Sequence, residues 1–449
     1  MYQFKDLDEF STFIKGRRVV VMGLGLQGGG VDSAQFFARL QAKVLVTDLK
    51  TEEQLADSLK QLKPYDNISY VLGRHRLQDF IKADLVIKNP VVPWDNKYLK
   101  AAKSNNAWVL SSVDLFFLLA KTKNIIGVTG TRGKSTVSSM IYSFLKNKLP
   151  SYLLGNVPNS QTLQTLFKLK PGDWVVMELS SWMLSGLHNI KKSPKYAVFT
   201  SFYPDHLNYY ATMQDYFYDK SAVFSYQSSS DYLIANRQIQ PYLSKYKLNS
   251  NVLLYSGQDF PYKPAYLLGK HNQTNSAGVF RLLVDVFKYQ ADEVVKFLVN
   301  FKPIAFRLEV VKKVGNLTFV NDSTSTTPTA LLKAVSAFSE KNFILIMGGN
   351  SKGLPYDNLI KHLAKAKKIY LLPGSFTEEI LPKLRLKYPD KVSANCTTLE
   401  SLLTNIKQNY LGKEKDYYVL FSPGATSFAQ FNNEFDRGRV FNQLITKIF

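Results

Sequence analysis

One glycine-rich segment, residues 127–136 with the sequence GVTGTRGKST, carries the residue types best suited to chemistry in this chain. It follows an apolar run at residues 124–126 and precedes the helical pattern VSSMIYSFLKNKL, so it predicts a strand, a turn and the start of a helix. Gly130 and Gly133 allow backbone N–H groups to approach an anion, and the following helix adds the positive end of its dipole. The turn is therefore suited to binding phosphate groups.

Three side chains after the glycines extend this phosphate chemistry. Lys134 is placed to reach the outer phosphates of a nucleotide, and Ser135 or Thr136 offers a hydroxyl to a magnesium ion. The spacing differs from a strict Walker A loop, because Val128 stands six positions before the lysine, where that loop has glycine. The segment is therefore P-loop-like, and the alternative is a glycine turn that binds no ligand.

Side chains that close other apolar runs are candidates for metal and acid–base chemistry. Glu178 closes the run WVVME, which predicts a carboxylate at a sheet edge facing the phosphate loop and suited to Mg²⁺. His206 follows the run YAVFTSF in a chain with only 5 histidines. Lys220 lies in the aromatic segment YFYDKSAVF, where a bare ammonium is costly to bury and a modified lysine would explain its presence. A surface glutamate and a structural histidine are the plainer alternatives.

Length and composition indicate a multidomain enzyme. A chain of 449 residues is long enough for about three domains. Its most apolar stretch, residues 108–120, is short and interrupted by polar residues, so no membrane span is expected. The opening MYQFKDLDEF does not resemble a secretory signal, which predicts a cytoplasmic protein. Cys396 is the only cysteine, which excludes an internal disulfide and a cysteine metal cluster.

The charge balance leaves two classes of function open. The chain has 57 Lys and Arg residues against 35 Asp and Glu residues, a formal net charge of +22. The electrostatic field of so positive a protein attracts polyanions such as nucleic acids. A nucleic-acid-stimulated P-loop ATPase is therefore an alternative function of a different class. The lysines are scattered in pairs, however, with no long basic block, so we expect a solvated surface and no obligatory nucleic-acid partner.

The elements that must position these side chains are predicted to form three α/β units. In the first, residues 1–112, the strand VVVMG leads into Gly23-x-Gly25-x-x-Gly28, and a second strand ends at Asp48. This is the dinucleotide fingerprint with its acidic residue about twenty positions on. It predicts a Rossmann-like domain that binds a nicotinamide cofactor or another diphosphate, with further strands at ISYVLG, ADLVIKN and AWVLSS.

The second unit, residues 113–302, places the phosphate loop in a P-loop-type ATPase domain with the strands WVVMELS, YAVFTSF, DYLIANR and NVLLYSG. The third unit, residues 303–449, begins with a hairpin in EVVKKVGNLTFVND and continues with the strands FILIMGG, KIYLLPG and YVLFSPG. This pattern predicts a C-terminal Rossmann-like α/β domain. Open α/β sheets place their sites at the carboxyl ends of strands, where these candidate side chains lie.

Nine motifs in order along the chain resemble those of the Mur ligase family, ATP-dependent enzymes that join an amino acid to a carboxylate. They are GVTGTRGKST, ELSSW, PDHLNYY, the lysine at 220, LLGKHNQTN, FRLE, NDSTSTTP, MGGNSKG and SPGATSFAQFNNEFDRG. The opening GLGLQGG and the closing SPGATSFAQF are similar to the MurD-type branch, which adds glutamate to UDP-N-acetylmuramoyl-L-alanine. So many motifs in register over nearly the whole chain leave little room for chance.

The resemblance implies roles for individual residues. The catalytic residues would be Lys134, Glu178, His206 and Lys220. ATP would be bound by Gly130, Thr131, Arg132, Gly133, Lys134, Ser135, Thr136, Asn272, Arg307 and Asp322. Mg²⁺ would be held by Ser135, Glu178, His206 and Lys220, the last as a carbamate formed from CO₂. The UDP-sugar would contact Leu26, Gln27, Asp48, Asn89, Asn156 and Ser180, and the incoming amino acid would contact Thr326, Lys352, Ser427 and Phe428.

The reaction implied by the resemblance is ligation of D-glutamate to UDP-N-acetylmuramoyl-L-alanine by a monomeric enzyme of peptidoglycan synthesis. ATP would convert the substrate carboxylate into an acyl phosphate, and the amine would then attack and expel phosphate. Positioning and preorganised electrostatics would supply most of the acceleration. Because Arg307 and Asp322 belong to the third domain, catalysis would depend on closure of that domain, which also excludes water.

Three residues depart from the MurD-type pattern and leave the acceptor open, and the first of them removes a cation near the reacting phosphate or the acceptor. Thr324 in NDSTSTTP stands where lysine is usual, and Met183 in SSWML replaces a common glutamine. Glu434 falls where an aromatic residue is usual, with Phe435 beside it. L-Glutamate is therefore the second candidate acceptor. A folate-polyglutamylating or other ligase of the superfamily is a further alternative, but it should lack the UDP-type first domain.

Overall fold

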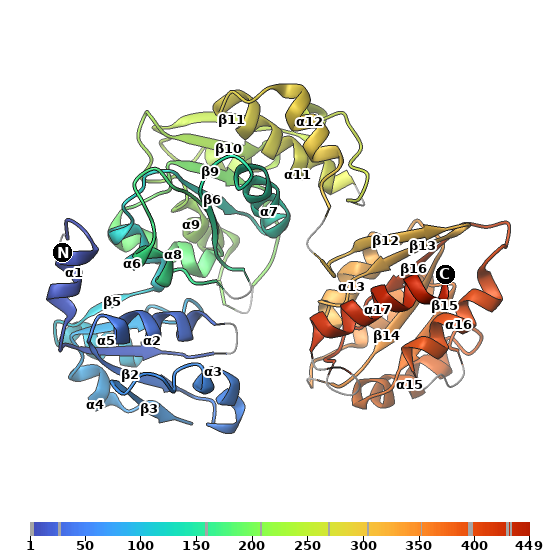
Figure 1. The fold of residues 1–449 in the computed structure, drawn as a ribbon, viewed down its shortest axis with the longest axis horizontal. Helices are drawn as coiled ribbons and strands as arrows, with labels where there is room; N and C mark the ends of the chain where they lie inside the picture. The colour runs from blue at the N-terminus through green and yellow to red at the C-terminus, as the bar shows by residue number, and fades with distance from the viewer. Residues whose placement is uncertain are drawn as a thin grey trace. The chain divides into compact units, whose positions relative to one another are not determined.

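The computed structural model describes residues 4–25, 28–157, 160–206, 209–267, 270–302, 305–351, 353–393, 398–427, 431 and 433–449. Their strands form three sheets, coloured blue to cyan, green to yellow, and orange to red in Figure 1. The chain forms two compact units, Met1–Pro261 with Gln273–Leu298, and Tyr262–Asn272 with Val299–Phe449. The first unit carries two sheets and the second carries one. The α/β fold class predicted from the sequence is confirmed.

The first sheet has the strand order β3-β2-β1-β4-β5 with parallel neighbours, which is the order of a Rossmann-type sheet. Its strands are β1 (Arg18–Met22), β2 (Lys43–Asp48), β3 (Ile68–Leu72), β4 (Leu85–Lys88) and β5 (Trp108–Leu110), as the apolar runs predict. The helices are α1 (Leu7–Ile14), α2 (Gly29–Arg39), α3 (Ala56–Lys60), α4 (Leu77–Ile81) and α5 (Lys97–Ser104). Side chains alternate along β1, so Val21 faces a core with Phe36 and Val20 faces another core.

The second sheet has the order β11-β10-β9-β6-β8-β7, also parallel throughout. Its strands are β6 (Ile125–Thr129), β7 (Ser151–Gly155), β8 (Trp174–Glu178), β9 (Tyr196–Phe199), β10 (Tyr232–Asn236) and β11 (Asn251–Tyr255). The helices are α6 (Ser112–Leu119), α7 (Lys134–Leu145), α8 (Ser181–Ile190), α9 (Met213–Ser221), α10 (Gln240–Leu243), α11 (Lys270–Phe280) and α12 (Ala291–Val299). The sequence pattern did not predict β7, because its apolar run SYLLG is short and carries no alternation.

The third sheet has the order β12-β13-β16-β14-β15, with only β12 antiparallel to its neighbour. Its strands are β12 (Glu309–Val314), β13 (Leu317–Asn321), β14 (Phe343–Gly348), β15 (Lys368–Leu372) and β16 (Tyr417–Phe421), so the predicted hairpin over Gly315 is confirmed. The helices are α13 (Pro328–Ala337), α14 (Asp357–His362), α15 (Ser375–Lys387), α16 (Leu399–Tyr410) and α17 (Glu434–Ile448). Along β14, Leu345 packs in the core with Leu331 of α13, and Ile346 packs in the opposite core with Phe441 of α17.

Within the first unit, α2 is joined to the loop that precedes the 3-10 helix Gln164–Phe167. The Asp32 carboxylate accepts hydrogen bonds from the backbone N–H groups of Leu163 at 2.8 Å and Gln164 at 3.1 Å. The Arg39 guanidinium lies 3.8 Å above the centre of the Phe167 ring. Burial raises the pKa of Asp32 to about 6, against the lowering effect of the two N–H donors. The first two sheets are therefore fastened to each other by buried polar contacts.

The strands of the three sheets fall within the predicted domains 1–112, 113–302 and 303–449, whose boundaries stay a prediction. None of the helices in the described ranges is long and apolar enough to cross a membrane.

Candidate active site

The predicted phosphate loop connects the buried central strand β6 to α7. Gly130 has a φ of 144° and Gly133, the residue before the helix, has a φ of 86°. A Cβ atom at Gly130 would collide with the Thr200 hydroxyl, and one at Gly133 would lie 2.5 Å from Asn275 Oδ1. Both positions therefore require glycine. Gly133 caps α7 without a side-chain hydrogen bond, so the positive end of the helix dipole lies at this loop and favours an anion there.

A second loop, residues 200–203 after β9, holds the phosphate loop in place. The Thr131 N–H donates to the Ser201 carbonyl at 2.7 Å, and the Arg132 N–H donates to Ser201 Oγ at 2.9 Å. The Thr131 hydroxyl accepts from the Tyr203 N–H at 3.0 Å. These contacts preorganise the loop before any ligand binds. Sequence reasoning did not single out Ser201, although its position after an apolar strand was a usable signal.

Two lysines meet at one carbonyl of this loop. Lys134 Nζ and Lys220 Nζ each donate to the Gly130 carbonyl at 3.0 Å. Lys220 comes from α9, is 1% exposed, and lies 4.7 Å from the centre of the Tyr216 ring. Burial, and secondly the positive charge of Lys134, hold the pKa of Lys220 well below its ordinary value. Burial in this site therefore disfavours the charged ammonium form of Lys220.

Glu178 lies at the carboxyl end of β8, which pairs with β6 through Val128. Its side chain is 1% exposed, and Oε1 accepts from Asn156 Nδ2 at 2.9 Å. The other oxygen, Oε2, is buried without a hydrogen-bond partner in the described part of the chain. A buried carboxylate oxygen without a donor is costly, and a cation beside it would remove that cost. Glu178 therefore fits a Mg²⁺ ligand.

Among the described residues, no cluster of three or more His, Cys, Asp or Glu side chains is arranged to hold a metal. A Mg²⁺ ion at Glu178 would therefore need further oxygen ligands, such as the Ser135 hydroxyl and nucleotide phosphates.

His206 belongs to the same edge of the second sheet. It adopts a positive φ of 55°, and its ring lies 4.5 Å from that of Trp182 and 5.9 Å from that of Tyr216. The Tyr216 hydroxyl is 3.3 Å from Thr131 Oγ1 in the phosphate loop. Tyr216 thus connects His206, Lys220 and the phosphate loop, and sequence reasoning missed it because aromatic residues are common in that segment.

Two residues predicted at the UDP-sugar site flank the glycine turn of the first sheet. Asp48 Oδ2 accepts from the Gly25 N–H at 3.0 Å, and its Oδ1 accepts from the Lys50 N–H at 2.9 Å. Asn89 Nδ2 lies 3.5 Å from the Gly23 carbonyl. In this structure Asp48 therefore fastens the turn. Leu26 and Gln27 lie outside the described residues.

The other two predicted UDP-sugar residues lie beside the second sheet. Asn156 Nδ2 donates to Glu178 Oε1, and Ser180 Oγ accepts from the Met183 N–H at 3.3 Å as the cap of α8. Direct contact of either residue with a sugar nucleotide stays a prediction.

In the second unit, Asp322 follows β13 and Ser427 follows β16, the parallel neighbour of β13. Both side chains are buried, with exposed fractions of 6% and 3%. Asp322 accepts from the Ser422 hydroxyl at 2.7 Å and from the Leu308 N–H at 3.2 Å. Arg307 is exposed, and Thr326 lies in the loop before α13.

Three further residues were predicted at the nucleotide and amino-acid sites. Asn272 is buried near the start of α11. Lys352 and Phe428, predicted at the amino-acid pocket, lie outside the described residues, as does Cys396.

The buried carboxylate of Asp322 gives a prediction for stability against pH. Burial raises its pKa from 3.8 to about 7, so between these values the native protein holds a proton that the unfolded chain has released. Wild-type stability should therefore fall through this window by up to about 1.4 kcal/mol for each pH unit. Asp322→Asn carries no such proton, so its melting temperature should rise relative to wild type across the window. Thermal unfolding at a series of pH values measures this, and a constant difference would contradict the raised pKa.

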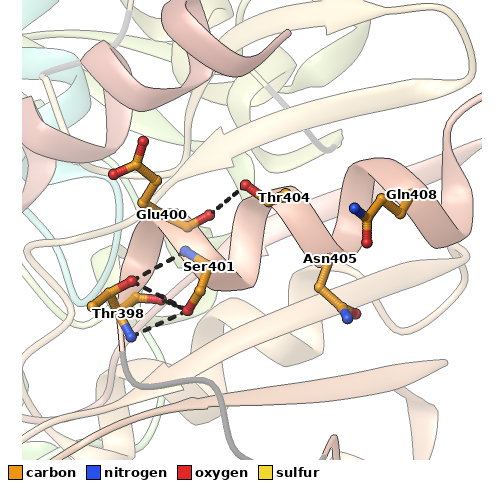
Figure 2. A pocket seen from close by; sticks show the side chains of 6 residues that line it. All are labelled: Thr398, Glu400, Ser401, Thr404, Asn405 and Gln408. Atoms are coloured by element: carbon orange, nitrogen blue, oxygen red, sulfur yellow. Dashed lines mark hydrogen bonds between the residues drawn. The ribbon is translucent and has the colours of Figure 1, made fainter.

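A separate polar pocket of about 580 Å³ lies along α16 in the second unit. Figure 2 shows its lining residues, which are Thr398, Glu400, Ser401, Thr404, Asn405 and Gln408. The hydroxyls of Ser401 and Thr404 donate to backbone carbonyls of the same segment, at 2.8 and 2.9 Å. None of the six residues was predicted to take part in chemistry, so the pocket is not part of the candidate site.

Comparison with known proteins agrees with this geometry. Residues 17–111 match the N-terminal domain of MurD-like Mur ligases, and residues 128–282 match the Mur ligase middle domain. A UDP-N-acetylmuramoylalanine–D-glutamate ligase of Borreliella afzelii is 37% identical over 454 residues, covering 96% of this chain and 98% of the relative. The chain belongs to the MurD-type branch of the Mur ligase family. The Treponema pallidum enzyme of the same name is 30% identical and covers 99% of the chain and 100% of its own length.

Solved structures of Mur ligases share the fold. The ligase MurC of Thermotoga maritima superimposes with a TM-score of 0.55 at 18% identity, covering 96% of this chain and 99% of that one. The ligase MurF of Thermotoga maritima, solved in complex with ADP, gives a TM-score of 0.53 at 16% identity and covers 90% of this chain and 95% of that one. At this level of identity the similarity establishes the fold alone. The Mur ligase resemblance predicted from the nine motifs is confirmed.

Proposed function

We propose that this Mur ligase joins D-glutamate to UDP-N-acetylmuramoyl-L-alanine at the expense of ATP, in the synthesis of peptidoglycan precursors. The observation that carries the proposal is the full-length similarity to ligases of that name, which includes the third sheet where the amino acid would bind. The phosphate loop with Lys134 supports it, because the loop is preorganised for the anionic end of a nucleotide.

The proposed reaction has two steps. A carboxylate oxygen of the L-alanyl group attacks the γ-phosphorus of ATP, and ADP leaves. The glutamate amine then attacks the acyl phosphate, loses a proton, and the tetrahedral intermediate expels inorganic phosphate as the amide forms. Lys134 and the N–H groups at the start of α7 stabilise the charge on the transferring phosphoryl group. Arg307 and Asp322 are proposed to complete the nucleotide site.

We propose that Mg²⁺ is held by Ser135, Glu178, His206 and a carbamate on Lys220. When bound, the ion would neutralise negative charge on the phosphate groups. The carbamate is supported by the burial of Lys220 and its depressed pKa, because an uncharged amine is required for addition to CO₂. The metal itself is supported by the unpartnered Glu178 Oε2, since a bound cation would stabilise that buried carboxylate oxygen.

The substrate sites follow from the same proposal. The UDP-sugar is assigned to the glycine turn beside Asp48 and Asn89, with Leu26, Gln27, Asn156 and Ser180 as further contacts. The amino acid is assigned to Thr326, Lys352, Ser427 and Phe428. A monomeric state and a cytoplasmic location stay predictions, as do the boundaries of the three domains.

Purified protein should release ADP only when Mg²⁺, ATP, UDP-N-acetylmuramoyl-L-alanine and glutamate are all present. A coupled ADP assay with D-glutamate and L-glutamate in parallel identifies the acceptor, and we expect turnover with D-glutamate. Preferential turnover with L-glutamate would correct the acceptor and leave the reaction class in place. ADP release that needs no UDP-sugar but rises with DNA would instead indicate the nucleic-acid-stimulated ATPase.

A further inference from the structure

Arg307 lies in a backbone segment with an uncommon conformation. Phe306 before it and Leu308 after it both adopt positive φ angles, of 66° and 47°. Neither residue is glycine, and a bulky side chain is disfavoured in this left-handed region by the clash of its Cβ with the backbone. Such residues persist where neighbouring groups hold them, and they gather at ligand-binding loops. The contacts around Arg307 therefore indicate what holds it in place.

Both peptide groups that flank Arg307 are held by specific hydrogen bonds. The Phe306 carbonyl, on one side, accepts from the Thr324 hydroxyl at 2.8 Å and from the Thr324 N–H at 3.1 Å. The Leu308 N–H, on the other side, donates to Asp322 Oδ1 at 3.2 Å. One residue thus supplies both donors to the carbonyl that precedes Arg307.

The Phe306 residue is fixed at two further points. Its N–H donates to Glu309 Oε2 at 2.8 Å. Its ring packs so closely against α17 that a Cβ atom at Gly438 would come within 2.5 Å of it, and the Phe435 ring centre is 6.4 Å away. Phe306 is therefore a half-buried anchor of the segment, while the side chain of Arg307 is exposed.

We propose that Thr324 is a positioning residue that sets the orientation of Arg307. The inference rests on the proposed function, in which Arg307 contacts the nucleotide. Where lysine is usual in MurD-type enzymes, Thr324 supplies two hydrogen bonds to the backbone that carries an arginine. This accounts for the departure without placing Thr324 in the glutamate pocket, and it assigns the residue to the ATP side of the reaction.

The first test separates the hydroxyl from the rest of the side chain. Thr324→Val keeps the shape and the N–H bond but removes the hydroxyl donor, so the KM for ATP should rise about fivefold. The KM for glutamate should stay within about twofold, because the hydroxyl does not touch the acceptor. Thr324→Ser restores the donor and should return the KM for ATP close to the wild-type value.

A matched control is Thr404→Val in α16. The Thr404 hydroxyl also donates to a backbone carbonyl, that of Glu400 at 2.9 Å, and it lies in the same unit. This variant should leave both KM values unchanged. Three results would overturn the inference. Thr324→Val could raise the KM values for ATP and glutamate equally, or it could leave the KM for ATP unchanged. Thr324→Ser could also fail to restore the wild-type KM for ATP.

A double-mutant cycle tests whether Thr324 acts through Arg307. If it does, Arg307→Ala combined with Thr324→Val should have the same KM for ATP as Arg307→Ala alone. Additive effects would show an independent role for Thr324 and contradict the proposal.

Hydrogen exchange gives a readout that does not depend on ligase activity. The Leu308 and Phe306 amides should exchange faster in Thr324→Val than in wild type, while amides of β14 should be unaffected. Equal exchange at Leu308 in the two proteins would refute the positioning role even if the enzyme proved inactive. An inactive wild-type protein with the expected change in exchange would count against the proposed function and leave the positioning of Arg307 supported.

Discussion

Replacing Lys134 by Ala is expected to lower kcat for ADP release at least about a hundredfold, a loss of about 3 kcal/mol in transition-state stabilisation. In the structure its Nζ donates to the carbonyls of Gly130 at 3.0 Å and Thr131 at 3.1 Å, so it is already held over the loop where the phosphates would lie. Negative charge moves between phosphate oxygens during the reaction, and a fixed ammonium stabilises it without reorganisation.

Lys146→Ala serves as the matched control for this prediction. Lys146 is exposed at the other end of α7, so its removal should leave kcat unchanged. Steady-state ADP release with saturating UDP-sugar and glutamate measures both variants. Turnover of Lys134→Ala at the wild-type rate would remove the assignment of residues 127–136 as the nucleotide loop.

Replacing Lys220 by Ala is expected to abolish measurable ligation, because it removes both the carbamate and the metal site that depends on it. Formate or acetate should restore part of the activity, since a short carboxylate can occupy the space vacated by the side chain. Chloride at the same ionic strength should not. Lys220→Met retains most of the side-chain volume but has no amine. It therefore separates loss of the carbamate from the effect of a cavity beside Tyr216.

Lys192→Ala, at an exposed position of the same unit, is the control for charge alone and should retain activity. Activity is measured in buffer equilibrated with CO₂ and in buffer depleted of it. Wild-type protein should lose turnover on depletion and regain it when bicarbonate is added. Full activity of Lys220→Ala, or no response of the wild type to CO₂, would be incompatible with a carbamate.

The sequence by itself predicted the chemical class and most of the fold. Apolar runs that end in glycine or a polar residue specify buried parallel strands, because a strand covered on both faces has no polar positions until it leaves the sheet. The antiparallel hairpin β12–β13, which precedes Asp322, was predicted from its turn at Gly315. The rule for parallel strands located β1 to β6 and β8, which ends at Glu178. It missed β7, whose three apolar side chains are too few to distinguish a strand from a loop.

Local chemistry was also readable where it depends on consecutive residues. The turn requires positive φ angles at Gly130 and Gly133, which glycine adopts far more readily than other residues. The glycines in the sequence were therefore enough to identify the phosphate loop. The family resemblance was likewise legible, since motif order along the chain is a property of the sequence itself.

Contacts between residues distant in the sequence were decided only by tertiary structure. The shared carbonyl of Gly130 that accepts from both Lys134 and Lys220 is one example, because the two lysines are separated by 86 positions. The burial that lowers the pKa of Lys220 and raises that of Asp322 is a property of the packed surroundings, which composition does not encode. From the sequence alone, Thr324 could be recognised only as a departure from the lysine that is usual at this position in MurD-type enzymes. Its hydrogen bonds to Phe306 could not be predicted from the sequence, because a hydrogen bond depends on the positions of donor and acceptor in space and not on their order along the chain.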